Sequence, residues 1–182
     1  MRTIKKILLA IIIILIIGFV IISDSFDRRQ YYSTITPKDE QIEFFMYKTT
    51  EDQEKAFEKN FGNRKYQFPR KKVEEIKLFK NTFLISRLTS KTVSESNRME
   101  VLSFFNSPVN FNWSETTWED TDSEYILRFY DYQNNEIGKI WLCMEDCGMT
   151  KSFPFSPNMK YGGLSETGRK NIRRIINKIL TE

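Results

Sequence analysis

The chain contains two cysteines, Cys143 and Cys147, whose thiols could form a disulfide, bind a metal or act in redox chemistry. Their C-x3-C spacing differs from the C-x-x-C spacing of thioredoxin-type redox motifs. A closed zinc site here would need two carboxylates or a second chain, because the sequence has no histidine. We therefore predict a local disulfide between Cys143 and Cys147, across the turn that separates them. The alternative is a pair of buried free thiols.

The absence of histidine removes the commonest general base and the commonest metal ligand. The sequence also lacks the phosphate-binding P-loop, the nucleophile motif G-x-S-x-G, the dinucleotide-binding motif G-x-G-x-x-G and the zinc motif H-E-x-x-H. We therefore expect no enzyme activity, no cofactor and no metal site. A hydrolase or thiol enzyme with an unrecognised site is the alternative.

Carboxylates are dense in residues 115–124, which contain Glu115, Glu119, Asp120, Asp122 and Glu124. A calcium-binding loop needs acidic ligands at fixed alternating positions and a central glycine, and this segment has no glycine. A glycosidase pair cannot be recognised without the fold. We therefore predict an acidic loop that precedes a strand.

A basic segment with interleaved aromatic residues, FGNRKYQFPRKK, is the candidate interaction surface. Its cationic residues are Arg64, Lys65, Arg70, Lys71 and Lys72. Such a mixture could stack on nucleic-acid bases or lie on anionic lipid headgroups. The alternative is a solvated loop whose aromatic side chains fold back into the core.

The overall charge argues against nucleic acid as a partner. Three of the 28 basic residues precede residue 24, which leaves 25 basic against 24 acidic residues in the remainder, a net charge of +1. Residues 59–80 carry eight basic residues, whereas residues 114–146 carry nine acidic ones. We expect these to be solvated faces that attract one another within the fold. Two oppositely charged binding surfaces are the alternative.

An uncharged segment, residues 7–23, determines in which compartment the rest of the chain lies. Its seventeen residues would rise roughly 26 Å as a helix, slightly less than the ~30 Å hydrocarbon core of a bilayer, and Lys5 and Lys6 can snorkel to make up the difference. The run is longer than a typical signal-peptide core, and the one small-x-small cleavage site ends at Ser25. We predict a transmembrane signal-anchor over residues 1–23, with a cleaved signal as the alternative.

The domain boundaries follow from this segment. Residues 24–40 are polar and form a predicted linker, and residues 41–182 form a predicted extracytoplasmic domain. The lysines before the apolar run lie next to the membrane, whereas Asp24 and Asp27 follow it, which favours a cytoplasmic N-terminus. Cleavage near Ser25 would instead give a secreted or periplasmic protein.

The predicted domain is α+β with a mainly antiparallel sheet. Residues 41–48 and 73–79 resemble strands, and residues 94–106 a helix capped by Ser94. The clearest unit is a hairpin over residues 124–144, with alternating side chains on both sides of an Asn134-Asn135 turn. Both of its faces are apolar enough to place it centrally. The segment around residues 150–157 is confined to an edge or loop by two prolines.

A C-terminal amphipathic helix begins after Ser165 and is predicted to pack on the sheet. Five apolar residues recur at helical spacing: Ile172, Ile175, Ile176, Ile179 and Leu180. Arg and Lys residues occupy most of the opposite side.

Taken together, these features predict a single-pass membrane protein whose small α+β domain binds another protein or the cell envelope outside the cytoplasm. The first alternative is an immunity or inhibitor-type protein, held at the membrane to neutralise a specific partner.

Overall fold

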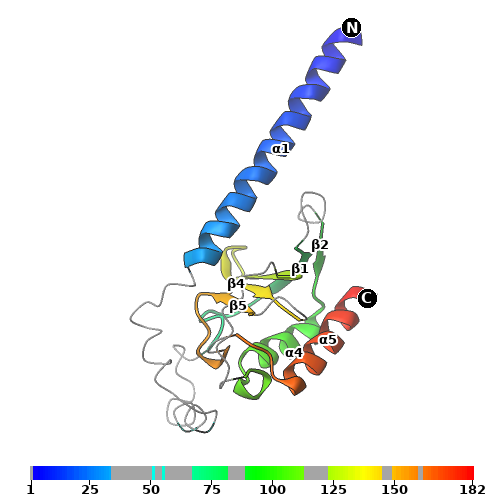
Figure 1. Ribbon diagram of the computed structural model, residues 1–182. Coiled ribbons are helices and arrows are strands. Elements are labelled where there is room, and N and C mark those ends of the chain that lie inside the picture. The colour runs from blue at the N-terminus through cyan, green and yellow to red at the C-terminus, as the bar shows by residue number, and fades with distance from the viewer. Residues whose placement is uncertain are drawn as a thin grey trace.

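The computed structural model describes residues 2–33, 51, 55, 67–81, 89–112, 123–144, 149–159 and 162–182. Within these residues the chain is α+β, as the sequence predicts: a five-stranded antiparallel sheet with helices, preceded by a long apolar helix. Figure 1 shows the sheet between two kinds of helix, with α4 and α5 on one side and α1 departing from the other.

The sheet has the strand order β2-β1-β3-β4-β5, and all neighbouring strands are antiparallel. Its strands are β1 (Glu75–Lys80), β2 (Ser90–Thr92), β3 (Tyr125–Tyr130), β4 (Glu136–Leu142) and β5 (Lys151–Phe153). The prediction of a strand over residues 73–79 is confirmed with a shift of its start, and the edge position of the proline-flanked segment is confirmed by β5.

The predicted hairpin is confirmed and lies at the centre of the sheet. Strand β3 pairs with β1 and β4, and the turn between β3 and β4 places Asn134 at φ 61°, the left-handed region that asparagine tolerates. The carboxylate of Asp131 accepts hydrogen bonds from the backbone N–H groups of Gln133 and Asn135, both at 2.9 Å. This side chain therefore organises the tight turn.

The hydrophobic core lies between the sheet and the helices α4 (Glu95–Phe105) and α5 (Glu166–Thr181). The sheet contributes Ile76, Leu78, Leu127, Phe129, Ile140 and Leu142. Helix α4 contributes Val101, Phe104 and Phe105, and it begins after Ser94 as predicted, although the Ser94 side chain makes no capping hydrogen bond. Burying each large apolar side chain contributes roughly 1.5 to 3 kcal/mol, so this layer dominates the stability.

Helix α5 packs on the sheet through the predicted isoleucines. The Ser165 side chain caps the helix by accepting the N–H of Gly168 at 3.0 Å. Four of the five predicted apolar residues are buried, but Leu180 is 44% exposed. At 3.6 residues per turn Leu180 lies about 80° from Ile172, at the margin of the apolar stripe. The expectation that Leu180 packs in the core is therefore wrong.

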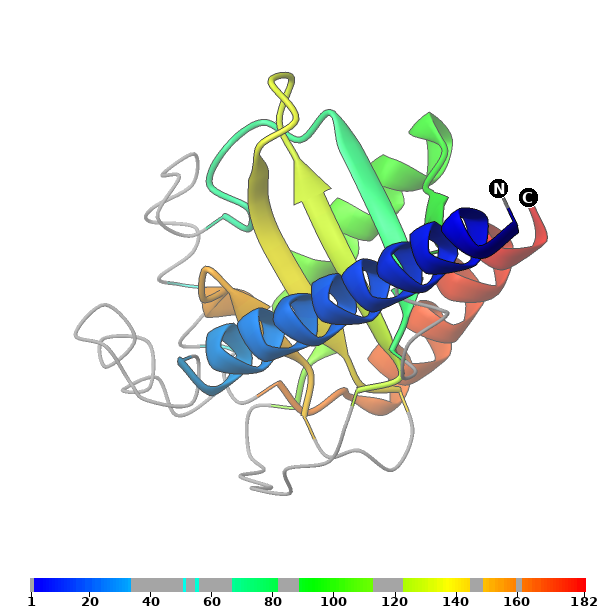
Figure 2. The ribbon, with the colours of Figure 1, turned by 90° about the horizontal axis from the view of Figure 1, so that it is seen from above.

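Helix α1 (Arg2–Ser33) contains an apolar span, Ile4–Ser23, that is long enough to cross a membrane or to act as a signal sequence. Only Val20 is buried in this span, all of whose residues the structure describes. The helix continues to Ser33, into residues 24–40, for which the sequence predicts a linker. It contacts β5, and Figures 1 and 2 agree that it leaves from the side of the sheet opposite α4 and α5.

Two short elements complete the described fold, the 3-10 helices η2 (Pro108–Asn110) and η3 (Pro157–Met159). Strand β2 was not predicted, because three residues cannot show an alternating pattern. The predicted strand over residues 41–48 lies outside the described residues.

Candidate functional site

The predicted interaction surface is only partly within the described residues. Arg64 and Lys65 lie outside them, whereas Arg70, Lys71 and Lys72 form the approach to β1. Arg70 is half-buried, and Lys71 and Lys72 are exposed. The structure therefore places the two lysines where a partner could reach them.

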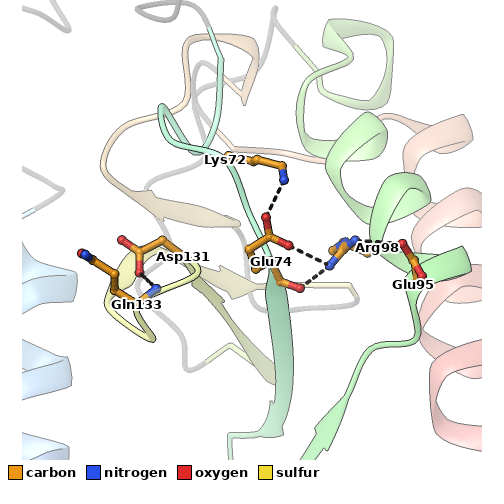
Figure 3. Close-up of polar contacts among 6 residues, drawn as sticks. All are labelled: Lys72, Glu74, Glu95, Arg98, Asp131 and Gln133. Atoms are coloured by element: carbon orange, nitrogen blue, oxygen red, sulfur yellow. Dashed lines mark hydrogen bonds and ion pairs between the residues drawn. The ribbon is translucent and has the colours of Figure 1, made fainter.

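A network of ion pairs and hydrogen bonds connects Lys72, which precedes β1, with the start of α4 (Figure 3). Its Nζ lies 2.6 Å from Glu74 Oε1, and Arg98 on α4 donates to the backbone carbonyl of Glu74. The second nitrogen of Arg98 lies 3.4 Å from Glu95 Oε1. The hydrogen bond and the charge of Lys72 lower the pKa of Glu74, and the charge of Arg98 adds to this effect. This network fastens the start of α4 to the segment immediately before β1.

Asp131, in the turn between β3 and β4, is a second polar group near this network (Figure 3). Hydrogen bonds from Asn135, together with the Gln133 amide, lower the pKa of Asp131, and the charge of Lys71 acts in the same direction. Lys71 of the basic segment therefore attracts Asp131 of the hairpin turn. That the two oppositely charged segments pair within the fold stays a prediction.

The cysteine prediction extends beyond the described residues. Cys143 is buried at the end of β4 and takes part in a disulfide, while Cys147 lies outside the described part of the chain. The backbone N–H of Cys143 donates to Thr150 Oγ1 at 3.1 Å, and the Thr150 hydroxyl donates to the Cys143 carbonyl at 3.2 Å. These bonds hold Cys143 beside the strand that follows. The pairing of Cys143 with Cys147 stays a prediction.

Of the predicted acidic loop, only Glu124 lies within the described residues. Its carboxylate accepts the backbone N–H of Met144 at 2.6 Å, which ties the two ends of the hairpin together. Glu115, Glu119, Asp120 and Asp122 lie outside the described part. No group of acidic or cysteine side chains that could hold a metal ion occurs among the residues that were described.

A charged row crosses the face of the sheet that points away from α4 and α5. The Cα pairing places Lys77 opposite Arg128, and Arg128 opposite Lys139. Like charges on directly opposite strand positions repel one another, so the row needs compensation. Glu136 supplies it for two of the cations: its carboxylate lies 3.1 Å from Arg128 and 3.2 Å from Lys139. Glu75 lies 3.1 Å from Lys77.

Aromatic rings stand beside each of the three cations. Lys77 Nζ lies 5.1 Å from the Tyr130 ring centre, the Arg128 guanidinium 5.2 Å from Phe79, and Lys139 Nζ 5.5 Å from Trp141. Burial raises the pKa of Tyr130, and the charge of Arg128 opposes that rise. Such cation–π contacts stabilise positive charge within the face.

Burial divides this row into an accessible and an inaccessible part. The side chains of Lys77 and Arg128 are 29% and 22% exposed, whereas Lys139 is fully buried. The accessible part can attract an anion. Sequence reasoning missed this row, because only strand register shows that Lys77, Arg128 and Lys139 are neighbours. Its one signal in the sequence is that Arg128 and Lys139 interrupt apolar strands.

Comparison with protein-family models, with curated proteins and with solved structures finds no match to this chain. The fold and the charged surfaces therefore supply the functional argument.

Proposed function

We propose that this chain is a single-pass membrane protein that holds a small α+β binding domain outside the cytoplasm, where the domain contacts another protein or the cell envelope. The observation that carries this proposal is the exposure of α1. Large apolar side chains along Ile4–Ser23 face solvent in the described structure, among them Ile14 at 67% and Leu15 at 65% exposure.

This exposure distinguishes α1 from the core helices. Helix α5 buries its isoleucines against the sheet, whereas the span of α1 buries Val20 alone. Exposed apolar area of this extent is unfavourable in water and is removed when the helix enters a bilayer. A twenty-residue helix rises about 30 Å, which matches the thickness of the hydrocarbon core.

The charges next to the span support the orientation. Three basic residues precede the span and three follow it, so their number does not decide. Lys5 and Lys6 abut the span, whereas Asp24 and Asp27 stand between it and the basic residues that follow, which favours a cytoplasmic N-terminus. A disulfide at Cys143 also suits an oxidising compartment outside the cytoplasm. The described surfaces present exposed charged side chains, among them Lys71 and Lys72, which a binding partner could contact.

Membrane insertion is tested by alkaline extraction of membranes from cells that express the full chain. We expect the protein to stay in the membrane pellet and its N-terminus to begin before residue 24. An Ile13→Arg/Ile14→Arg variant should be released, whereas Ile13→Leu/Ile14→Leu should behave as the parent does. Release of the parent chain, or a mature N-terminus near Phe26, would contradict the anchor.

Orientation is tested with C-terminal reporter fusions. Alkaline phosphatase, which folds only outside the cytoplasm, should be active as a fusion, and a cytoplasm-dependent fluorescent protein should be dark. The reverse pattern would place the domain inside the cell and overturn this part of the proposal.

The binding partner is tested by crosslinking in intact cells, followed by co-purification from detergent. The exposed pair Lys71→Glu/Lys72→Glu should reduce recovery of the partner, while Lys170→Glu, on the exposed side of α5, serves as the matched control. If the recovered partner is a toxin or enzyme whose activity falls on binding, the narrower inhibitor form of the proposal applies.

A further inference from the structure

Helix α4 is packed differently along its two halves. Its second half buries three apolar residues in the core, Val101, Phe104 and Phe105. Its first half, residues 95–100, all of which the structure describes, buries no apolar side chain, and its one buried residue is Asn97. Asn97 occupies the first position of the i, i+4, i+7, i+8 stripe that the three apolar residues continue. A polar residue therefore stands where the pattern favours an apolar one.

Two other asparagines beside α4 have the hydrogen bonds that Asn97 lacks. The Asn106 side chain, at the end of the helix, donates to the Phe68 carbonyl at 2.6 Å and accepts the Phe68 N–H at 2.7 Å. Asn110, in η2, donates to the Phe104 carbonyl at 2.9 Å. Asn97 is fully buried, yet among the described residues neither polar atom of its side chain has a hydrogen-bond partner. Burial of an unpaired amide disfavours the closed position of this half of the helix.

The first half of α4 is held by the network that Figure 3 shows. Arg98 donates to the Glu74 carbonyl and lies 3.4 Å from Glu95. Lys72 lies 2.6 Å from Glu74. Because the Lys72 and Glu95 side chains are 86% and 89% exposed, water and salt screen these pairs. The Ser94 side chain, which precedes the helix, makes no capping hydrogen bond. These attachments are weaker than the apolar packing of the second half.

We propose that residues 95–100 form a switch segment, which opens from the domain as a unit while the second half of α4 stays packed. Opening gives the Asn97 amide access to water, where it recovers the hydrogen bonds that burial removes. Segments with few buried apolar contacts are the ones that open locally in native proteins. Since charge holds the closed state, salt should favour opening.

Lys72 links this segment to the candidate interaction surface, because it belongs to both. An acidic group that binds Lys72 would compete with Glu74 for it and would loosen the start of α4. The opening itself requires neither the membrane anchor nor a partner, so its failure would leave the proposed function unchanged.

The test is hydrogen–deuterium exchange of the full chain in detergent micelles, measured at single backbone amides. The reporters are the amides of residues 98–100. The references are the amides of Phe105 and Asn106, whose helical acceptors lie in the second half of α4. We expect the reporters to exchange at least about tenfold faster than the references, after correction for intrinsic rates. Salt at high concentration should widen this difference.

Three variants connect the exchange rates to the two causes. Asn97→Leu continues the apolar stripe with a side chain of similar size, and it should slow the reporters about tenfold. Glu74→Gln weakens the network and should speed them about two- to fivefold. Glu75→Gln is the matched control, because Glu75 is the next residue and pairs with Lys77 on its own strand. This variant should leave the reporters unchanged.

Several results would overturn the proposal. Reporters that exchange as slowly as the references would show that the segment stays closed. Fast exchange that neither Asn97→Leu nor Glu74→Gln changes would be ordinary fraying of a helix end. Faster exchange in Asn97→Leu would show that the amide stabilises the closed helix. If Asn97→Leu does not fold, the two glutamate variants and the salt response decide, and equal effects of Glu74→Gln and Glu75→Gln would contradict the switch.

Discussion

The two faces of the sheet are built from the same strands, but one is apolar and the other carries a row of charged residues. On one face Ile76, Leu127 and Ile140 are fully buried beneath α4 and α5. On the other, at the neighbouring register positions, Lys77, Arg128 and Lys139 form a charged row. Since strand side chains alternate, a shift of one residue in the pairing would exchange the two sets. The apolar face thereby specifies the register that assembles the charged row.

This comparison assigns most of the stability to one of the two faces. The helix-covered face derives its stability from burial, which is non-directional and large. The face that points away from α4 and α5 carries the ion pairs and cation–π contacts of the charged row, whose contributions are smaller and depend on geometry and salt. Changes on the first face should therefore destabilise the chain most, whereas changes to the partly exposed ion pairs of the second face should cost less stability.

The largest effect is expected from Ile176→Ala on α5. Ile176 is 1% exposed in the core, and truncation of such a residue costs about 2 to 5 kcal/mol. Leu180→Ala on the same helix is the control: Leu180 is 44% exposed, and its loss should cost about 0.5 kcal/mol or less. Denaturant unfolding of the detergent-solubilised chain measures both. Equal losses would show that the two residues share one environment.

Gly168→Ala should have the next largest effect, although alanine favours helix over glycine by about 1 kcal/mol. A Cβ at Gly168 would lie 1.9 Å from the carbonyl oxygen of Asn110, so α5 would have to move away from η2. We expect a loss of about 1 to 3 kcal/mol. Gly163→Ala, whose nearest contact would be 3.9 Å away, should leave the melting temperature almost unchanged. A stabilising Gly168→Ala would show that the close approach is dispensable.

Lys139, the buried cation of the charged row, should show energetic coupling with its partner Glu136. Lys139→Met leaves Glu136 without one of its two cations, and Glu136→Gln leaves Lys139 buried without this carboxylate. The double variant should cost less than the sum of the single ones, by about 0.5 to 3 kcal/mol. A double-mutant cycle on unfolding free energies measures this. The more exposed pair Lys77–Glu75 should couple by about 1 kcal/mol or less, and the reverse order would contradict the division by burial.

The smallest effect is expected at the hairpin turn, from Asp131→Asn. The folded-state pKa of Asp131 lies below its usual value, mainly because Asn135 donates hydrogen bonds to the carboxylate. Its stabilisation is therefore present above the unfolded pKa, about 3.9, and is lost as the pH falls through the lower folded value. Unfolding curves of parent and variant should differ near neutral pH and converge in acid. A difference that persists in acid would assign the effect to the turn geometry instead of the charge.

Local sequence pattern determined several elements correctly. The uncharged run predicted the apolar span of α1, the asparagine turn predicted the hairpin, and the isoleucine spacing predicted the buried side of α5. Each of these signals lies within one segment, where residue type and periodicity report directly on backbone conformation. The candidate surface was predicted less well. Lys71 and Lys72 are exposed, but the sequence did not predict the charged row of Lys77, Arg128 and Lys139.

Tertiary structure alone decided which segments meet. The three-residue strand β2 exists because it pairs with β1, and Leu180 is exposed because it lies at the margin of the α5 stripe. The full burial of Lys139 contradicts what its residue type suggests, and Glu136 and Trp141 beside it make that burial tolerable. These properties depend on contacts between residues far apart in the chain. The sequence by itself therefore determined the apolar helix, the hairpin and the C-terminal helix, whereas tertiary contacts determined strand β2 and the set of charged residues that are neighbours in the sheet.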